Sequence, residues 1–73
     1  MNNSLYSNQW YNKEQAKDFS VLPCYPLKLY TVDDRIIDGF YYNGNFYNRN
    51  DEEVTAWIEA WMIQQNGEEI HIN

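Results

Sequence analysis

Residues 35–48 read RIIDGFYYNGNFYN, and the prediction of the fold starts from this stretch. The dipeptide Asn43-Gly44 separates two aromatic runs. It favours a two-residue type I′ turn, in which both turn residues take a positive φ. The stretch therefore predicts a β-hairpin, with strands over residues 35–42 and 45–48.

A third strand precedes this hairpin. Residues 27–32 (LKLYTV) alternate and are rich in β-forming residues, and Asp33-Asp34 after them is a turn signal. We therefore expect a three-stranded antiparallel meander over residues 27–32, 35–42 and 45–48. Apolar residues lie on both faces of its middle strand. One face is thus expected to pack against a helix and the other to form an aromatic surface.

The period of the apolar residues changes after residue 50. Their spacing follows the i, i+3, i+4, i+7, i+8 pattern of an amphipathic helix. Acidic residues at its start suit the positive end of a helix dipole, and Asn66-Gly67 is a stop signal. The sequence predicts a helix over residues 51–65 packed on the meander. Its apolar stripe is Val54, Trp57, Ile58, Trp61 and Met62.

Two shorter elements complete the prediction. A short helix is expected within residues 8–19, with Asn12 as its N-cap. The alternating residues 68–73 (EEIHIN) favour a short last strand. The predicted fold class is thus α+β: an antiparallel meander, a C-terminal amphipathic helix and a final strand.

The length and the N-terminal sequence limit the number of domains and the location of the protein. A chain of 73 residues is expected to form a single domain over residues 1–73, with residues 1–7 loosely ordered. A single cysteine excludes an intramolecular disulfide, and residues 1–12 lack the pattern of a signal peptide. No apolar run reaches the length of a membrane span, so no membrane association is expected. The predicted location is cytoplasmic, in the host cell if a phage encodes the protein.

The charge is uneven along the chain. Residues 1–49 hold five acids and five bases, whereas residues 50–73 hold six acids and no Lys or Arg, which gives the net charge of −6. This balance argues against direct binding of nucleic acid, which needs basic residues for the phosphates. The acidic region is interpreted either as a contact surface for a basic partner or as a solvated face.

The sequence lacks the residue patterns of an enzyme. One Cys and one His cannot form a closed zinc site, and there is neither a phosphate-binding glycine loop nor a nucleophile elbow. Cys24 and His71 are the residue types of a nucleophile and its base, but a buried Cys24 and a solvent-facing His71 are favoured. We expect no enzymatic activity, no cofactor and no metal.

The tyrosines are too many for one core. Strand side chains alternate between two faces, so some tyrosines must lie on the surface, where tyrosine favours protein contacts. The candidate partner-binding residues are therefore acids of the C-terminal region together with two tyrosines of the meander. They are Asp51, Glu52, Glu59, Glu68 and Glu69 for charge, and Tyr41 and Tyr47 for the aromatic surface.

Several of these features occur together in a known family. In order along the chain they are Val21-Leu22-Pro23, the strand at residues 27–32, Gly39-Phe40, Asn43-Gly44, Phe46 and Val54-Thr55-Ala56-Trp57. Over residues 21–57 the chain resembles a small phage- and prophage-borne domain of unknown function, with a Leu-Pro, G-x-Y, aromatic, V-T-H-W pattern. The chain has Ala56 in place of the His and lacks the proline-rich end of that family. The family's V-T-H-W segment reads as a strand, whereas the spacing here favours a helix.

The resemblance implies an origin rather than a chemistry. It points to an accessory protein of a phage or mobile element. With the small size and the acidity, it suggests a non-enzymatic protein that binds and inhibits a host protein, for counter-defence or host takeover. One alternative is an acidic DNA mimic that occupies a nucleic-acid-binding channel. Another is a self-associating structural or adaptor protein, possible as a homodimer.

Overall fold

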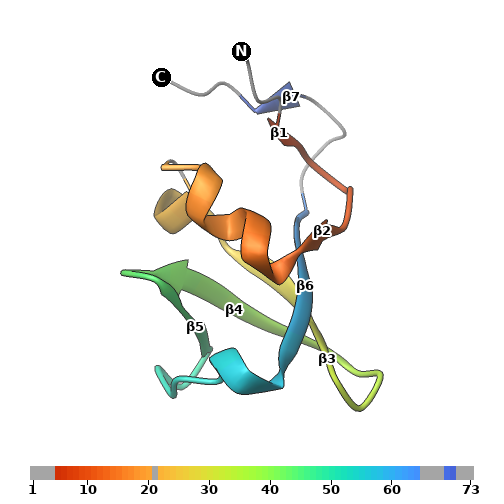
Figure 1. The fold of residues 1–73 in the computed structure, drawn as a ribbon, viewed down its shortest axis with the longest axis vertical. Helices are drawn as coiled ribbons and strands as arrows, with labels where there is room; N and C mark the ends of the chain where they lie inside the picture. The colour runs from red at the N-terminus through yellow and green to blue at the C-terminus, as the bar shows by residue number, and fades with distance from the viewer. Residues whose placement is uncertain (1–4, 21, 65–68, 71–73) are drawn as a thin grey trace.

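The computed structural model describes residues 5–20, 22–64 and 69–70 (Figure 1). These residues form a five-stranded antiparallel sheet of order β2-β6-β3-β4-β5 and a two-stranded sheet, β1-β7. The strands are β1 (Leu5–Tyr6), β2 (Tyr11–Asn12), β3 (Leu27–Thr31), β4 (Ile36–Tyr42), β5 (Asn45–Asn48), β6 (Ile58–Ile63) and β7 (Glu69–Ile70). The 3-10 turns are η1 (Lys13–Asp18), η2 (Leu22–Cys24) and η3 (Thr55–Trp57).

The three strands of the predicted meander are present. β3 pairs with β4 and β4 pairs with β5, both antiparallel. Asn43 and Gly44 join β4 to β5 with φ values of 52° and 87°, the positive values that a type I′ turn requires. Asp34 in the β3–β4 turn also has a positive φ, of 64°.

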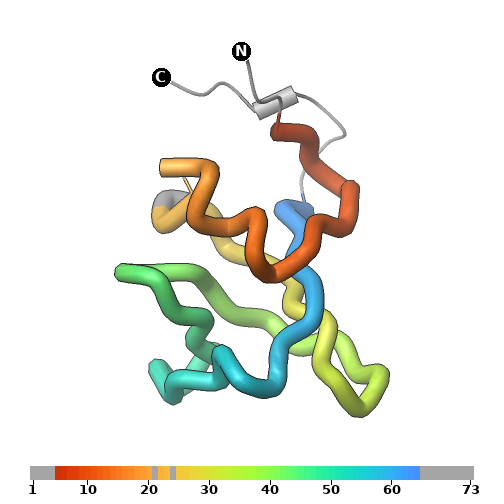
Figure 2. The backbone as a smooth tube through the Cα atoms, in the orientation of Figure 1, coloured from red at the N-terminus to blue at the C-terminus, as the bar shows by residue number. Residues whose placement is uncertain are grey.

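The predicted helix over residues 51–65 is wrong, and so is the α+β class that depended on it. Residues 49–51 form a turn and a bend, Glu53 forms an antiparallel bridge with Tyr47, η3 is a single 3-10 turn, and residues 58–63 are strand β6. β6 lies between β2 and β3 rather than on top of the sheet. Figure 2 shows this blue segment passing between the red and orange N-terminal segment and the yellow β3. Strands therefore dominate the described fold, and its helical parts are short 3-10 turns.

A bulge explains why a strand carries the spacing of a helix. Tyr30 lies opposite Ala60, but Thr31 lies opposite Ile58, so the pairing passes over Glu59. The extra residue places Ile58 and Trp61, three positions apart, on the same face. A regular strand would bury positions two apart. The β-branched and aromatic residues of the segment also suit a pleated sheet, and packing in the sheet outweighs the helical spacing.

The N-terminal segment folds back on the sheet. The helix expected within residues 8–19 is instead the 3-10 turn η1, which begins after Asn12, the predicted cap. The backbone N–H of Asn12 donates to Gln15 Oε1 at 2.9 Å, which fixes the start of the turn. η1 packs against β6 and buries Ala16, and the neighbouring Phe19 is buried as well.

The two ends of the described chain pair with each other. β1 pairs with β7, Leu5 opposite Ile70, so a short strand lies within residues 68–73 as expected. Leu5 is fully buried. Residues 1–4 of the predicted loose start, the stop signal at residues 66–67 and residues 71–73 lie outside the described residues.

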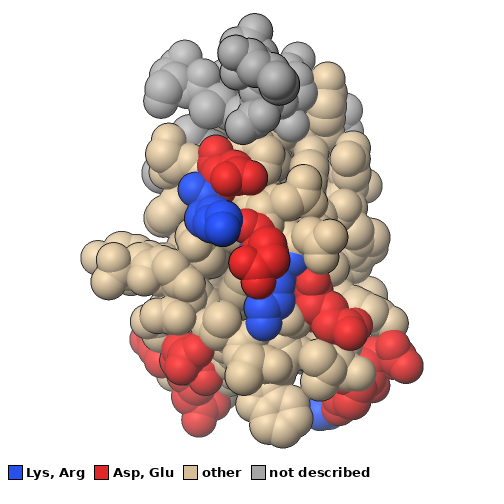
Figure 3. Space-filling model, in the orientation of Figure 1, with Lys and Arg blue, Asp and Glu red and all other residues tan. Residues whose placement is uncertain are grey.

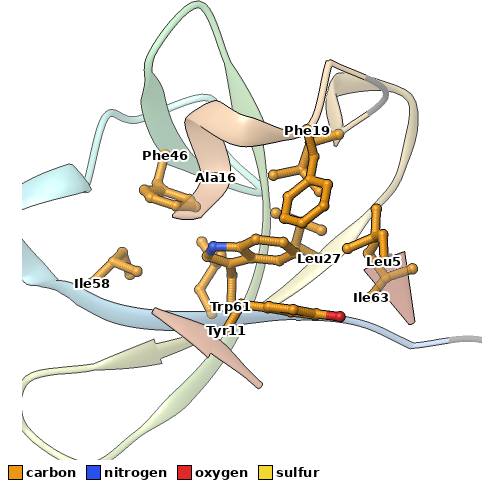
Figure 4. Packing of buried hydrophobic residues seen from close by; sticks show 11 residues of the cluster. Leu5, Tyr11, Ala16, Phe19, Leu27, Phe46, Ile58, Trp61 and Ile63 are labelled. Atoms are coloured by element: carbon orange, nitrogen blue, oxygen red, sulfur yellow. The ribbon is translucent and has the colours of Figure 1, made fainter. Parts of the chain in front are cut away.

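Trp61 lies at the centre of the core (Figure 4). Its side chain is 0% exposed and stacks on Tyr11 with ring centroids 4.7 Å apart. Phe19 meets it edge-on at 5.9 Å, and the indole Nε1–H donates to the backbone oxygen of Asn12 at 2.9 Å. Of the two tryptophans predicted to face a core, Trp61 is buried, whereas Trp57 is 61% exposed.

These two exposures predict opposite results for two matched substitutions. Trp61→Ala removes a buried ring and leaves a cavity, so we expect it to lower the free energy of unfolding by about 3–5 kcal/mol. Trp57→Ala should change it by less than about 0.5 kcal/mol, because the side chain is mostly solvated. Urea unfolding followed by circular dichroism measures both. Equal losses for the two variants would contradict this core.

Candidate protein-binding surfaces

The two tyrosines predicted to form one aromatic surface lie on opposite faces of the sheet. Tyr41 pairs with Phe46, and their ring centroids lie 4.9 Å apart on the core side. Tyr47 pairs with Phe40, and these rings stack at 5.2 Å on the other side. Side chains of neighbouring strand residues point to opposite faces, so Tyr47, which follows Phe46, lies on the side away from Phe46 and Tyr41. Both side chains are half-buried, but Tyr41 packs against the core whereas Tyr47 lies on the opposite side of the sheet.

The predicted acidic residues do not form one strip. Asp51 and Glu52 are exposed in the turn between β5 and η3, and Glu59 is exposed at the bulge of β6. β3 and β4 separate β5 from β6 in the sheet. The helix that would have aligned these acids is absent. Glu68 and the side chain of Glu69 lie outside the described residues.

Two groups of exposed acids, one in each of two loops, lie at the same end of the molecule (Figure 3). The backbone N–H of Val32 donates to the oxygen of Trp57 at 2.8 Å, and this bond brings the β3–β4 turn beside η3. Exposed acids of the two loops flank this junction at the lower end of Figure 3. We call this group the acidic end; its members are Asp33, Asp34, Asp51, Glu52 and Glu53. Sequence reasoning named Asp51 and Glu52 and missed Glu53 as well as the two acids of the β3–β4 turn.

Trp57 stands beside a hollow within the acidic end. A hollow of about 290 Å³ lies between Ile37, Val54 and Trp57, with the Asp33–Arg35 pair at its border. Val32 next to this region is 48% exposed. Sequence reasoning missed this apolar patch because it assigned Trp57 to a buried helical stripe.

Backbone hydrogen bonds fix the position of Trp57. The N–H of Trp57 donates to the oxygen of Val54, and the N–H of Val54 donates to the oxygen of Phe46, both at 2.8 Å. The N–H of Phe46 in turn donates to Thr55 Oγ1 at 2.8 Å. η3 is therefore tied to β5 on one side and to β3 on the other. The indole is presented to solvent from a fixed backbone.

Hydrogen bonds also keep two of the acids charged. Those from Thr31 and Arg35 lower the pKa of the Asp33 carboxyl below its usual value. The Arg35 Nε–H donates to Asp33 Oδ2 at 3.0 Å. Hydrogen bonds from Thr55 lower the pKa of Glu53, whose Oε2 accepts the Thr55 N–H at 3.1 Å. Asp33 and Glu53 thus stay anionic to a lower pH than free carboxylates do.

The sheet has a second surface, on the side away from Trp61. Strand registers place alternate residues of β3, β4, β5 and β6 on this side, which we call the outer face. Its members are Lys28, Tyr30, Ile36, Asp38, Phe40, Tyr42, Tyr47, Ala60 and Met62.

Three charges mark the middle of the outer face. Lys28 Nζ donates to Asp38 Oδ1 of the opposite residue, and Arg49 NH1 lies 3.8 Å from Asp38 Oδ2. The hydrogen bond from Lys28 lowers the pKa of Asp38.

Tyr30 contacts several residues at one end of the outer face. The ring of Trp10 meets Tyr30 edge-on at 5.9 Å, and both rings line a hollow of about 270 Å³ with Ile36 and Ala60. The hydroxyl of Tyr30 donates to Asp34, which raises the tyrosine's pKa. This rim of the outer face therefore adjoins the acidic end.

Neither surface offers a metal site in the described part of the chain. No three His, Cys, Asp or Glu side chains among residues 5–20, 22–64 and 69–70 come together as metal ligands. The side chain of Cys24 and the whole of His71 lie outside the described residues. Within the same described ranges, no helix has the length and apolar character needed to cross a membrane.

No protein-family model matches the sequence, and neither the curated proteins nor the solved structures give a match. The resemblance to a phage-borne domain over residues 21–57 therefore remains a prediction.

The lowered carboxyl pKa values predict how stability depends on pH. Asp33, Asp38 and Glu53 have a lower pKa when folded than when unfolded. Their contribution is therefore complete above the unfolded value of about 4 and is lost as pH falls through the folded value. We expect the urea midpoint to fall between pH 6 and pH 2.5. Asp38→Asn should reduce this fall, and an unchanged midpoint across the range would contradict the assignment.

Proposed function

We propose that this chain is a non-enzymatic, phage-type accessory protein that binds and inhibits a host protein, and that the acidic end is its contact surface. The phage origin rests on the resemblance over residues 21–57. The binding role rests on one observation: Trp57, 61% exposed, stands on a hydrogen-bonded turn beside the exposed acids of two loops.

The chemistry of this surface defines what it would recognise. Tryptophan is enriched among the residues that dominate binding energy, and a fixed backbone limits the entropy lost on docking. The surrounding carboxylates complement Lys and Arg, and an Arg guanidinium can also stack on the indole face. The expected partner surface carries basic residues around a side chain that enters the hollow between Ile37, Val54 and Trp57.

The exposed indole also separates this proposal from DNA mimicry. A mimic needs carboxylates spaced like phosphates over a broad face and gains little from a central apolar anchor. The described acids of the C-terminal region are divided between the acidic end and β6. An inhibitor anchored by Trp57 is therefore the better supported function, and a mimic remains an outcome that the test can return.

A capture experiment with matched variants tests the proposal. The immobilised chain is exposed to bacterial lysate at about 0.1 M and about 0.5 M salt, and the retained proteins are identified by mass spectrometry. We expect a retained protein to be lost with Trp57→Ala but kept with Tyr42→Ala, whose side chain is 60% exposed on the outer face. Glu52→Lys should weaken retention more than Glu59→Lys, although both change the net charge equally.

The salt dependence of retention distinguishes an inhibitor anchored by Trp57 from a DNA mimic. A partner held by Trp57 should remain partly bound at the higher salt, because apolar contact is not screened. Retention that is lost at the higher salt and is unchanged by Trp57→Ala would indicate binding by charge alone. That result would favour the DNA mimic. Equal effects of Glu52→Lys and Glu59→Lys would contradict a contact localised at the acidic end.

A further inference from the structure

The outer face carries a self-complementary pattern along the seam between β3 and β4. Directly opposite pairs on this face are Lys28 with Asp38 and Tyr30 with Ile36. Each pair joins unlike residues: a cation to an anion, and an aromatic ring to an aliphatic side chain. A two-fold rotation about an axis along the seam exchanges the members of each pair. A second copy turned in this way would therefore present Asp38 to Lys28 and Ile36 to Tyr30.

The outer face lacks the negative charge of the remaining surface, so a second copy is repelled less there than elsewhere. The whole chain carries −6, so two copies repel each other. The middle of the outer face holds Lys28, Arg49 and Asp38, an excess of one positive charge. The remaining surface therefore carries a net −7. Facing the outer faces inward keeps most of that negative charge on the outside of the pair.

The outer face also has apolar area to bury. Ile36 is 59% exposed, Tyr42 60% and Trp10 41%. The hollow lined by Trp10, Tyr30, Ile36 and Ala60 lies beside the seam and is open to an incoming side chain. Phe40 and Tyr47 form a stacked pair farther along the same face.

Pairing through the edge of β5 is a poorer route to a dimer. The N–H of Asn48 donates to Glu52 O at 2.9 Å, and the oxygen of Phe46 accepts from the Val54 N–H at 2.8 Å. The N–H of Phe46 is bound to Thr55 Oγ1. The chain's own 52–55 segment thus occupies these backbone groups and blocks strand addition there.

We propose that two copies of this chain dock through their outer faces about a two-fold axis along the β3–β4 seam. The four charges of Lys28 and Asp38 then alternate in sign around the axis, and Tyr30 and Ile36 of each copy cover those of the other. Four strands at about 4.8 Å spacing and about five residues at about 3.3 Å rise give a face of roughly 20 Å by 17 Å, which is smaller than a standard interface and typical of weak association. A contact of this size belongs to the weak, transient class, so we expect a dissociation constant on the order of 10 μM to 1 mM.

Charge-swapped variants test this arrangement with the purified full chain. Sedimentation equilibrium gives the dissociation constant from about 10 μM to 2 mM, the range set by the expected interface. Lys28→Asp places four carboxylates at the seam and Asp38→Lys places four ammonium groups there. Each change should weaken the dimer at least about tenfold by like-charge repulsion. An equimolar mixture of the two variants restores opposite charges and should form a heterodimer.

The double variant Lys28→Asp/Asp38→Lys keeps opposite charges both within a chain and across the axis. It should dimerise as the original chain does. If circular dichroism shows that a single variant does not fold, the dissociation constant of this double variant tests the proposed dimer instead. A chain that stays monomeric up to 2 mM would overturn the proposal. So would single variants that dimerise normally, or a mixture that shows no heterodimer. The test needs no host partner and leaves the acidic end unchanged, so its failure is distinct from failure of the proposed function.

Discussion

The fold depends on the burial of one indole. Trp61 is paired across the sheet with Leu29 on one side and Tyr11 on the other, and its Nε1–H is bound to Asn12 O. A buried indole N–H without a partner is costly, so the N-terminal segment must lie beside β6 to satisfy it. The same contact requires β6 to insert between β2 and β3. It thereby joins parts of the chain that are about 30 and 50 residues apart.

The insertion of β6 also explains the acidic end. The chain leaves β5 at one edge of the sheet and must reach a position between β2 and β3. It makes this passage through the loop at residues 49–54 and through η3, which is bound to the end of β3 by the Val32–Trp57 hydrogen bond. Trp57 is part of the passage rather than of the sheet, which is why it is exposed. Burial of one tryptophan thus places the other at the surface.

Local signals in the sequence were sufficient for the meander. The turn at Asn43-Gly44 and the alternation over residues 27–32 act over a few neighbours, and both predicted the observed strands. The position of β6 depends on pairing with distant residues, which no local pattern records. Its bulge at Glu59 then produced the i, i+3 spacing of a helix. The β-branched and aromatic residues among positions 54–63 (VTAWIEAWMI) were the available signal for a strand.

The candidate site was predictable only in part. Counting charges located an acidic region after residue 50, and Asp51 and Glu52 do belong to the acidic end. Asp33 and Asp34 join them because a backbone hydrogen bond brings two loops together, which sequence distance hides. Tyr41 and Tyr47 do not share one surface, because Tyr41 lies opposite Phe46 and Tyr47 lies opposite Phe40, and neighbouring strand positions face opposite sides of the sheet. Alternation alone could have separated those two residues.

The two proposed surfaces are linked by charge. The acidic end lies at the β3–β4 turn and η3, whereas the proposed dimer seam runs along the strands, so docking of two outer faces leaves two acidic ends free. A basic partner at an acidic end reduces the net charge of −6 and therefore the repulsion between copies. Under both proposals, two linked acidic ends would raise the effective concentration of the second contact with a partner that carries two basic sites.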